Sequence, residues 1–253
     1  MEFELWQFAV LFAAAFFGGF IDSIAGGGGL ISLPALLAVG VPPHVAIATN
    51  RFQGSFGSFT AALNFIRKGY VDAAEILHGV IFTFVGGLVG AYVLLLIDAK
   101  FLNYLIPILL LALFIYMIFS PNLGEAPAKP KMSKKSFYAI FGLILGFYDG
   151  FFGPGTGSFW TFALVGILGL YMKKAVAHTK VLNFTSNIVS LGVFIIGGQI
   201  LWLVGAVMAV GQIAGSFAGS SLVMRCDVRF VRNMLLLVVA ATILKLLYGL
   251  IAN

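Results

Sequence analysis

Long apolar runs, separated by short polar or glycine-rich stretches, fill almost all of the 253 residues. In the first half these runs predict helices over about residues 5–24, 30–39, 42–66, 72–97 and 99–119. In the second half they predict helices over about residues 137–152, 156–170, 175–196, 201–224 and 230–250. Because about 20 apolar residues span a bilayer as a helix, the pattern predicts an all-α integral membrane protein without a soluble domain.

The composition favours the same class. Hydrophobic residues make up 61% of the chain and charged residues 9%, whereas soluble domains carry roughly 25% charged residues. The net charge of +6 needs no nucleic acid to explain it, because the basic residues fall mostly in predicted loops. Glu2 and Glu4 stand where a signal peptide carries positive charge, so the first apolar run is interpreted as a retained membrane segment.

Two glycine-rich stretches interrupt the apolar pattern at matching places. The first, at 19–29, contains Asp22 before four consecutive glycines, and the second, at 146–158, contains Asp149 before Gly-Pro-Gly. Each glycine costs a helix about 1 kcal/mol and a proline about 3 kcal/mol, so both stretches predict a helix, a break and a short helix that starts near the bilayer midplane. Paired breaks of this kind are typical of the binding site of a secondary transporter.

The two halves align as an internal repeat. Asp22 matches Asp149, and the block at 46–51 matches the block at 175–180. The blocks at 85–90 and 98–101 match those at 210–215 and 227–230 in the same order. We therefore expect a first transmembrane repeat at 1–119, a cytoplasmic linker at 120–136 and a second repeat at 137–253. Each repeat would be a glycine-broken helical hairpin followed by three transmembrane helices.

The distribution of loop cations predicts how the repeats are oriented. With the lysine-rich linker in the cytoplasm, eleven loop cations fall inside and one, Lys100, falls outside. The eleven are Arg67, Lys68, Lys129, Lys131, Lys134, Lys135, Lys173, Lys174, Arg225, Arg229 and Arg232. This count makes the repeats inverted in topology, with both termini outside. A parallel duplication, in which each broken helix crosses only once, would instead place Lys173 and Lys174 outside.

Three basic residues remain at membrane depth, namely Arg51, Lys180 and Lys245. Arg51 and Lys180 are repeat equivalents, and a charge at mid-bilayer costs roughly 2.5–3.5 kcal/mol, so each needs a partner or a function. Asparagine and glutamine side chains stand on the helices of Arg51 and Lys180 or near them. We predict a cationic substrate site made of Arg51 and Lys180 with Asn50, Gln53, Asn183, Asn187 and Gln212.

The starts of the short helices are expected to complete this site. A helix N-terminus attracts anions through its free N–H groups, which adds Gly28, Gly29, Gly155, Thr156 and Ser158 to the predicted substrate-binding residues. Asp22 and Asp149 are predicted to orient the glycine breaks or balance the cations. The alternative is that Arg51 and Lys180 simply form buried ion pairs with the two aspartates and hold the halves together.

His178 and Ser23 are further candidate structural or coupling residues. His178 could carry a proton near neutral pH, or it could be a plain polar residue. Ser23 follows Asp22, but Gly150 stands at the matching place in the second half, and no histidine lies at a readable spacing for a hydrolase. No cluster has the spacing of metal ligands. We therefore expect no enzyme activity, no metal and no cofactor.

At these residues the chain resembles the sulfite exporter TauE/SafE family of small membrane transporters. The resemblance covers nearly the whole chain and is carried by 19–29, 48–50, 146–158, and Lys180 with Asn183 and Asn187. It implies transport of sulfur oxyanions or organosulfonates, often as export across the bacterial inner membrane. A passive anion channel and a membrane scaffold without flux are the alternatives. The expected partners are a small anionic substrate and lipid, with a homodimer as an open option and no nucleic acid.

Overall fold

The computed structural model describes residues 3–119 and 129–222, and the described part of the chain is helical throughout with no strand. The first half contributes α1 (Leu5–Ala25), α2 (Gly29–Ala38), α3 (Pro43–Arg67), α4 (Ala73–Leu96) and α5 (Ala99–Phe119). The second half contributes α6 (Lys134–Phe151), α7 (Thr156–Gly166), α8 (Met172–Ile196) and α9 (Trp202–Leu222). The helix expected at 230–250, with Lys245, lies outside the described residues.

Most predicted helix boundaries lie within two residues of the observed ones, but α6 and α8 begin three residues earlier than predicted and α7 ends four residues earlier. Local capping marks some of the observed starts. Asp72 accepts a hydrogen bond from the N–H of Ala74 (2.8 Å) at the start of α4, and Ser133 accepts one from Ser136 (3.1 Å) at the start of α6. Proline occupies the first position of α3, where no N–H is needed. Four described helices, α1, α4, α8 and α9, are long and apolar enough to cross a membrane.

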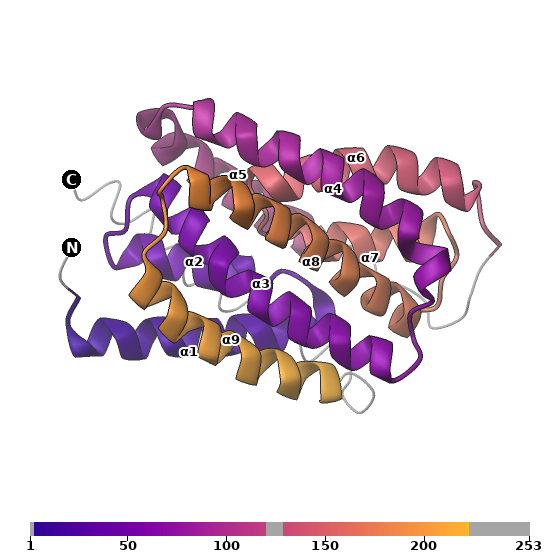
Figure 1. The fold of residues 1–253 in the computed structure, drawn as a ribbon, viewed down its shortest axis with the longest axis horizontal. Coiled ribbons are helices and arrows are strands. Elements are labelled where there is room, and N and C mark those ends of the chain that lie inside the picture. Colours follow the sequence, from indigo (N-terminus) through magenta and orange to yellow (C-terminus); the bar gives the residue numbers. More distant parts are fainter. Residues whose placement is uncertain (1–2, 120–128, 223–253) are drawn as a thin grey trace.

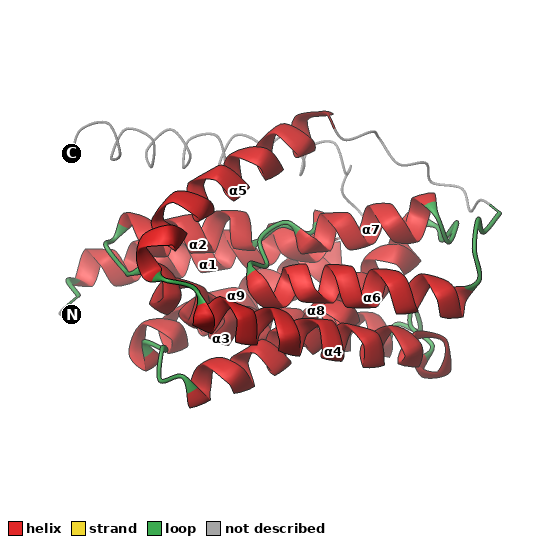
Figure 2. Cartoon of the chain, turned by 90° about the horizontal axis from the view of Figure 1, so that it is seen from above, coloured by secondary structure: helices red, strands yellow, loops and turns green. Residues whose placement is uncertain are grey.

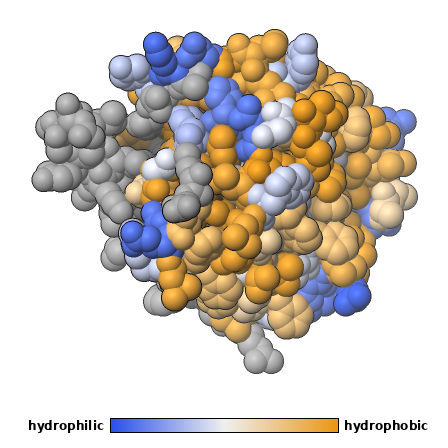
Figure 3. Space-filling model, turned by 60° about the vertical axis from the view of Figure 1, so that its left-hand side comes forward, coloured by the Kyte–Doolittle hydropathy of each residue, from blue (hydrophilic) through white to orange (hydrophobic). Residues whose placement is uncertain are grey.

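The long helices run roughly along one axis, with α3 and α8 side by side between α4 and α9 (Figure 1). Helix α5 crosses the bundle at an angle when it is seen from above (Figure 2). Large apolar side chains are exposed along α1, α4 and α9, and hydrophobic residues cover most of the face drawn in Figure 3, interrupted by hydrophilic patches. Such a surface suits contact with lipid rather than water.

Glycines let two pairs of helices pack closely, and each pair joins one helix of the first half to one of the second. Gly86 and Gly90 of α4 lie against the backbone of α6, near Leu143 and Phe147. Gly211, Gly215 and Gly219 of α9 lie against the backbone of α1, near Phe12, Phe16 and Phe20. The spacing of these small residues predicts packing, and the structure confirms it. Since the residue numbers rise together, α4 is parallel to α6 and α9 is parallel to α1.

The contacts at the two ends of the bundle fix the helix directions. At one end, Glu75 of α4 pairs with Lys134 at the start of α6 and with Lys174 near the start of α8 (2.6 Å). We call this the Glu75 end. At the opposite end, His44 at the start of α3 contacts the carbonyl of Leu94 near the end of α4 (3.2 Å), and we call it the His44 end. Helices α3 and α8 therefore run in opposite directions.

Both glycine-rich stretches break the helix as predicted. Helix α1 stops at Ala25, Gly26 and Gly27 have positive φ angles, and α2 begins at Gly29. Helix α6 stops at Phe151, Gly153 and Gly155 have positive φ angles, and α7 begins at Thr156. Each short helix folds back beside the helix that precedes it, because Gly28 returns to the level of Gly18 and Ile167 accepts a hydrogen bond from Lys131 (2.8 Å).

Candidate functional site

The two glycine breaks meet in the middle of the bundle. A Cβ atom added to Gly26 would lie 2.5 Å from the carbonyl carbon of Gly157, and one added to Gly29 would lie 3.2 Å from the Cα of Pro154. The contact between the breaks is therefore made by main chain on main chain, and only glycine permits it. The starts of α2 and α7 are brought together at this point.

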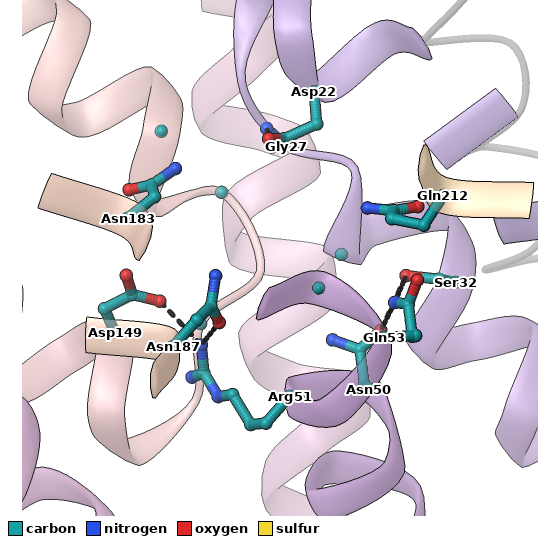
Figure 4. Close-up of a pocket in the computed structure, with 15 residues that line it drawn as sticks. Asp22, Gly27, Ser32, Asn50, Arg51, Gln53, Asp149, Asn183, Asn187 and Gln212 are labelled. Atoms are coloured by element: carbon teal, nitrogen blue, oxygen red, sulfur yellow. Dashed lines mark hydrogen bonds and ion pairs between the residues drawn. The ribbon is translucent and has the colours of Figure 1, made fainter. Parts of the chain in front are cut away.

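A polar cavity of about 40 Å³ lies beside these breaks. In Figure 4, Arg51, Asp149 and Asn187 lie on one side, amide and hydroxyl groups lie on the other, and Asp22 and Gly27 lie above. The residues that line it are Asp22, Gly27, Gly29, Ser32, Asn50, Arg51, Gln53, Gly54, Asp149, Gly153, Gly155, Gly157, Asn183, Asn187 and Gln212. This volume holds a few water molecules, since one water needs roughly 10–15 Å³ of such space.

Arg51 is the cation of this cavity. It is 3% exposed, and its Nη1 donates to Asp149 Oδ1 (2.8 Å) and to Asn187 Oδ1 (2.8 Å). Among the described residues, its Nε and Nη2 atoms have no hydrogen-bond partner. These two N–H groups form one edge of the guanidinium fork, which matches the oxygens of an oxyanion two at a time. A buried charged donor without a partner is costly, and Gly153 packs against the Nη2 side of this group.

Lys180 lies behind the cavity wall rather than on it. Its side chain is fully buried, and its Nζ donates to Asp22 Oδ2 (2.7 Å). The other oxygen of Asp22 accepts from the N–H groups of Gly27 and Gly28 (both 3.1 Å), where it caps the start of α2. Both cations therefore form ion pairs with the aspartates, as the alternative interpretation expected, although Arg51 also lines the cavity.

The ion pairs cross between the halves of the chain. Arg51 of the first half pairs with Asp149 of the second, and Lys180 of the second half pairs with Asp22 of the first. The two pairs are equivalent to each other in the repeat, because Arg51 matches Lys180 and Asp149 matches Asp22. The four formal charges cancel, so the centre is neutral when all four groups are ionised.

Amides and a hydroxyl make the opposite wall. Asn50 Oδ1 accepts from Ser32 Oγ (2.6 Å) and from Gln53 Nε2 (2.7 Å). Among the described residues, the side-chain oxygens of Gln53, Asn183 and Gln212 are buried and without a partner. Since the oxygen and nitrogen of an amide are assigned from such networks, each of these groups can offer either a donor or an acceptor to a ligand.

The structure brings most of the predicted site residues together. Asn50, Arg51, Gln53, Asn183, Asn187 and Gln212 line the cavity, as do Gly29, Gly155, Asp22 and Asp149. Six predicted residues do not line it, namely Lys180, Gly28, Thr156, Ser158, Ser23 and His178. Of these, Gly28 and Thr156 belong to the breaks, where Gly28 donates to Asp22 and Thr156 Oγ1 donates to the carbonyl of Gly153 (2.6 Å).

His178 and Ser23 lie in other surroundings. His178 is fully buried, its Nδ1 lies 2.9 Å from the hydroxyl of Tyr138, and its Nε2 lies 3.9 Å from Glu75 Oε2. It therefore faces the Glu75 end. Ser23 is fully buried, and its hydroxyl has no partner among the described residues.

Sequence reasoning missed five lining residues: Gly27, Ser32, Gly54, Gly153 and Gly157. Ser32 carried a usable signal, because it is a polar residue one turn into a short apolar helix, where its hydroxyl also donates to the carbonyl of Gly28 (3.2 Å). Within residues 3–119 and 129–222, no group of three His, Cys, Asp or Glu side chains could hold a metal ion.

Comparison with known proteins shows the family of this chain. The family described as "Sulfite exporter TauE/SafE" matches residues 11–246. The chain belongs to this family. A "Probable membrane transporter protein" of Haemophilus influenzae is 42% identical over 98% of this chain and 97% of its own length. "Probable membrane transporter protein YfcA" of Escherichia coli K12 is 44% identical over 94% and 89%.

A more distant relative, "Probable membrane transporter protein YunE" of Bacillus subtilis, is 25% identical over 85% of this chain and 88% of its own length. No solved structure matches the chain. The family and the names of its relatives identify this TauE/SafE protein as a membrane transporter.

Proposed function

We propose that this TauE/SafE protein is a secondary transporter that exports a small sulfur oxyanion or organosulfonate across the bacterial inner membrane. The open guanidinium edge of Arg51 carries the proposal, because it is a buried cationic donor in a polar cavity. Sulfonate and sulfite oxygens accept such hydrogen bonds. The starts of α2 and α7 meet beside the cavity, and their positive dipole ends favour an anion there.

Alternating access at this cavity between two inverted repeats is the proposed mechanism. The proposal is supported by the opposite directions of α3 and α8, which are repeat equivalents, and by those of α1 and α6. The small volume of the cavity favours a closed, occluded site over a continuous pore. The membrane potential favours export, since a monovalent anion that leaves a negative interior gains about 2.3 kcal/mol per 100 mV.

In Arg51→Lys, we expect the affinity for anions to fall by about 1.5–3 kcal/mol, the usual value of a hydrogen bond to a charged group. Lysine keeps the positive charge beside Asp149 but lacks the planar fork. Calorimetric titration of the purified protein with sulfite, thiosulfate, methanesulfonate and acetate would measure this change. Arg67→Lys, an exposed position on the same helix, is the matched control. Equal affinities in Arg51→Lys and the wild type would refute the proposed site.

The proposed topology places the linker at 120–136 and the Glu75 end in the cytoplasm, with the His44 end outside. Single cysteines at Lys129, Lys173 and Gly198, in a background without Cys226, test it by labelling with a membrane-impermeant maleimide. We expect Gly198→Cys to react from outside, and Lys129→Cys and Lys173→Cys to react only after the cells are opened. Labelling of Lys173→Cys from outside would favour the parallel duplication.

A further inference from the structure

We propose that Asp149 is a tethered counter-anion, which balances the charge of Arg51 whenever the transporter carries no substrate. This inference rests on the proposed function, because it assigns to Asp149 a role in the return of the empty transporter. Asp149 comes from α6 and Arg51 from α3, so the pair joins the two halves of the chain on one side of the cavity.

The carboxylate of Asp149 contacts Arg51 as a small bound anion would, through one oxygen. Asp149 engages only Nη1 of Arg51, and leaves the Nε and Nη2 edge open. Its other oxygen accepts a hydrogen bond from Ser186. Both side chains are nearly fully buried, at 3% and 4% exposed. A carboxylate in such surroundings is held by its counter-charge, because an unpaired buried charge is strongly disfavoured.

Asp149 differs from its repeat equivalent in how it is fastened. Asp22 is bound to the glycine break by the N–H groups of Gly27 and Gly28. In the second half, Pro154 stands at the position that matches Gly27, 127 residues later, and proline has no N–H to donate. Among the described residues, the side chain of Asp149 bonds to Arg51 and Ser186 and to no N–H group of its own glycine break. Asp22 is thus fastened to its break by two hydrogen bonds that Asp149 lacks.

The net charge of the site differs between the empty and the loaded transporter. The empty site holds two cations and two carboxylates and is neutral. A bound monovalent anion adds one negative charge, so the loaded transporter carries the charge of its substrate, and the membrane potential acts on that step alone. Without Asp149 the empty site would hold one buried cation without a counter-charge. This disfavours the closed state through which the empty transporter passes as it changes between its inward-facing and outward-facing forms.

The flux test compares Asp149→Asn with Asp149→Glu, which restores the charge, in proteoliposomes loaded with [35S]sulfite. We expect net efflux into sulfite-free buffer to fall about 100-fold in Asp149→Asn, the effect of leaving one buried charge unpaired. Exchange against external sulfite should continue, because the site is then never empty. Equal losses of net efflux and exchange in Asp149→Asn would overturn the proposal, as would unchanged net efflux.

A second measurement is independent of sulfite transport. In detergent, we expect sulfate to raise the melting temperature of Asp149→Asn relative to gluconate, because a free anion replaces the tethered one. Arg51→Met/Asp149→Asn, which lacks both charges, measures the general stabilisation by sulfate, and the rise in Asp149→Asn should exceed it. If the rise in Asp149→Asn does not exceed it, or Asp149→Asn folds in neither salt, the tethered role is wrong. A wild type that neither binds nor moves sulfite would instead contradict the proposed function, and the melting experiment would still decide the role of Asp149.

Discussion

Lys180→Met is expected to lower the free energy of unfolding by about 3–5 kcal/mol, because it leaves Asp22 as a buried carboxylate without its cation. Lys180 is fully buried and contacts Asp22 at 2.7 Å from behind the cavity wall. Melting of the purified protein in detergent would measure the loss. Methionine keeps much of the apolar volume, so the effect reports the charge.

The control for this experiment is the double variant Lys180→Met/Asp22→Asn. Asparagine keeps an oxygen that can accept from Gly27 and Gly28, and it removes the unpaired charge. We expect it to recover most of the lost stability, since replacing both members of a buried pair is often nearly neutral. Weakened anion binding with full stability in Lys180→Met would place Lys180 in the substrate site instead.

Gly26→Ala is expected to prevent correct assembly of the centre. Gly26 has φ 77° and ψ 159°, a backbone region that is essentially restricted to glycine and costs other residues about 1–3 kcal/mol. The added methyl would also lie 2.5 Å from Gly157, and overpacking of this kind costs typically about 1–3 kcal/mol more. The fraction of protein that elutes as a single folded species in size-exclusion chromatography would measure the effect.

Gly40→Ala separates the two causes. Gly40 also has a positive φ, 89°, but a Cβ there would meet no atom within 4 Å. We expect it to show backbone strain alone and to fold better than Gly26→Ala. Equal behaviour of the two variants would mean that the contact between the glycine breaks contributes nothing.

Much of the fold could be predicted because local chemistry determines it. Runs of apolar residues, the proline at the start of α3 and the consecutive glycines before α2 all act within a few residues of where they stand. The gathering of Asn50, Arg51, Asn183 and Asn187 could also be predicted, since buried polar residues on apolar helices must find one another.

Which of the two cations lines the cavity could not be predicted. Arg51 and Lys180 have equivalent sequence surroundings, yet only Arg51 lines the cavity. The difference depends on how α3 and α8 are rotated about their axes and on which carboxylate each meets, and both follow from packing between helices distant in sequence. Ser32 and Gly54 join the lining for the same reason.

The crossed ion pairs also constrain how the protein is made. Asp22 and Lys180 are 158 residues apart in the chain, and Arg51 and Asp149 are 98 residues apart. A ribosome adds about 5–20 residues per second, so Arg51 waits on the order of 5–20 s for its partner to be synthesised. During that interval the nascent first half holds a cation and a carboxylate that only the later half can neutralise, and its insertion into the bilayer has to tolerate both until translation reaches Lys180.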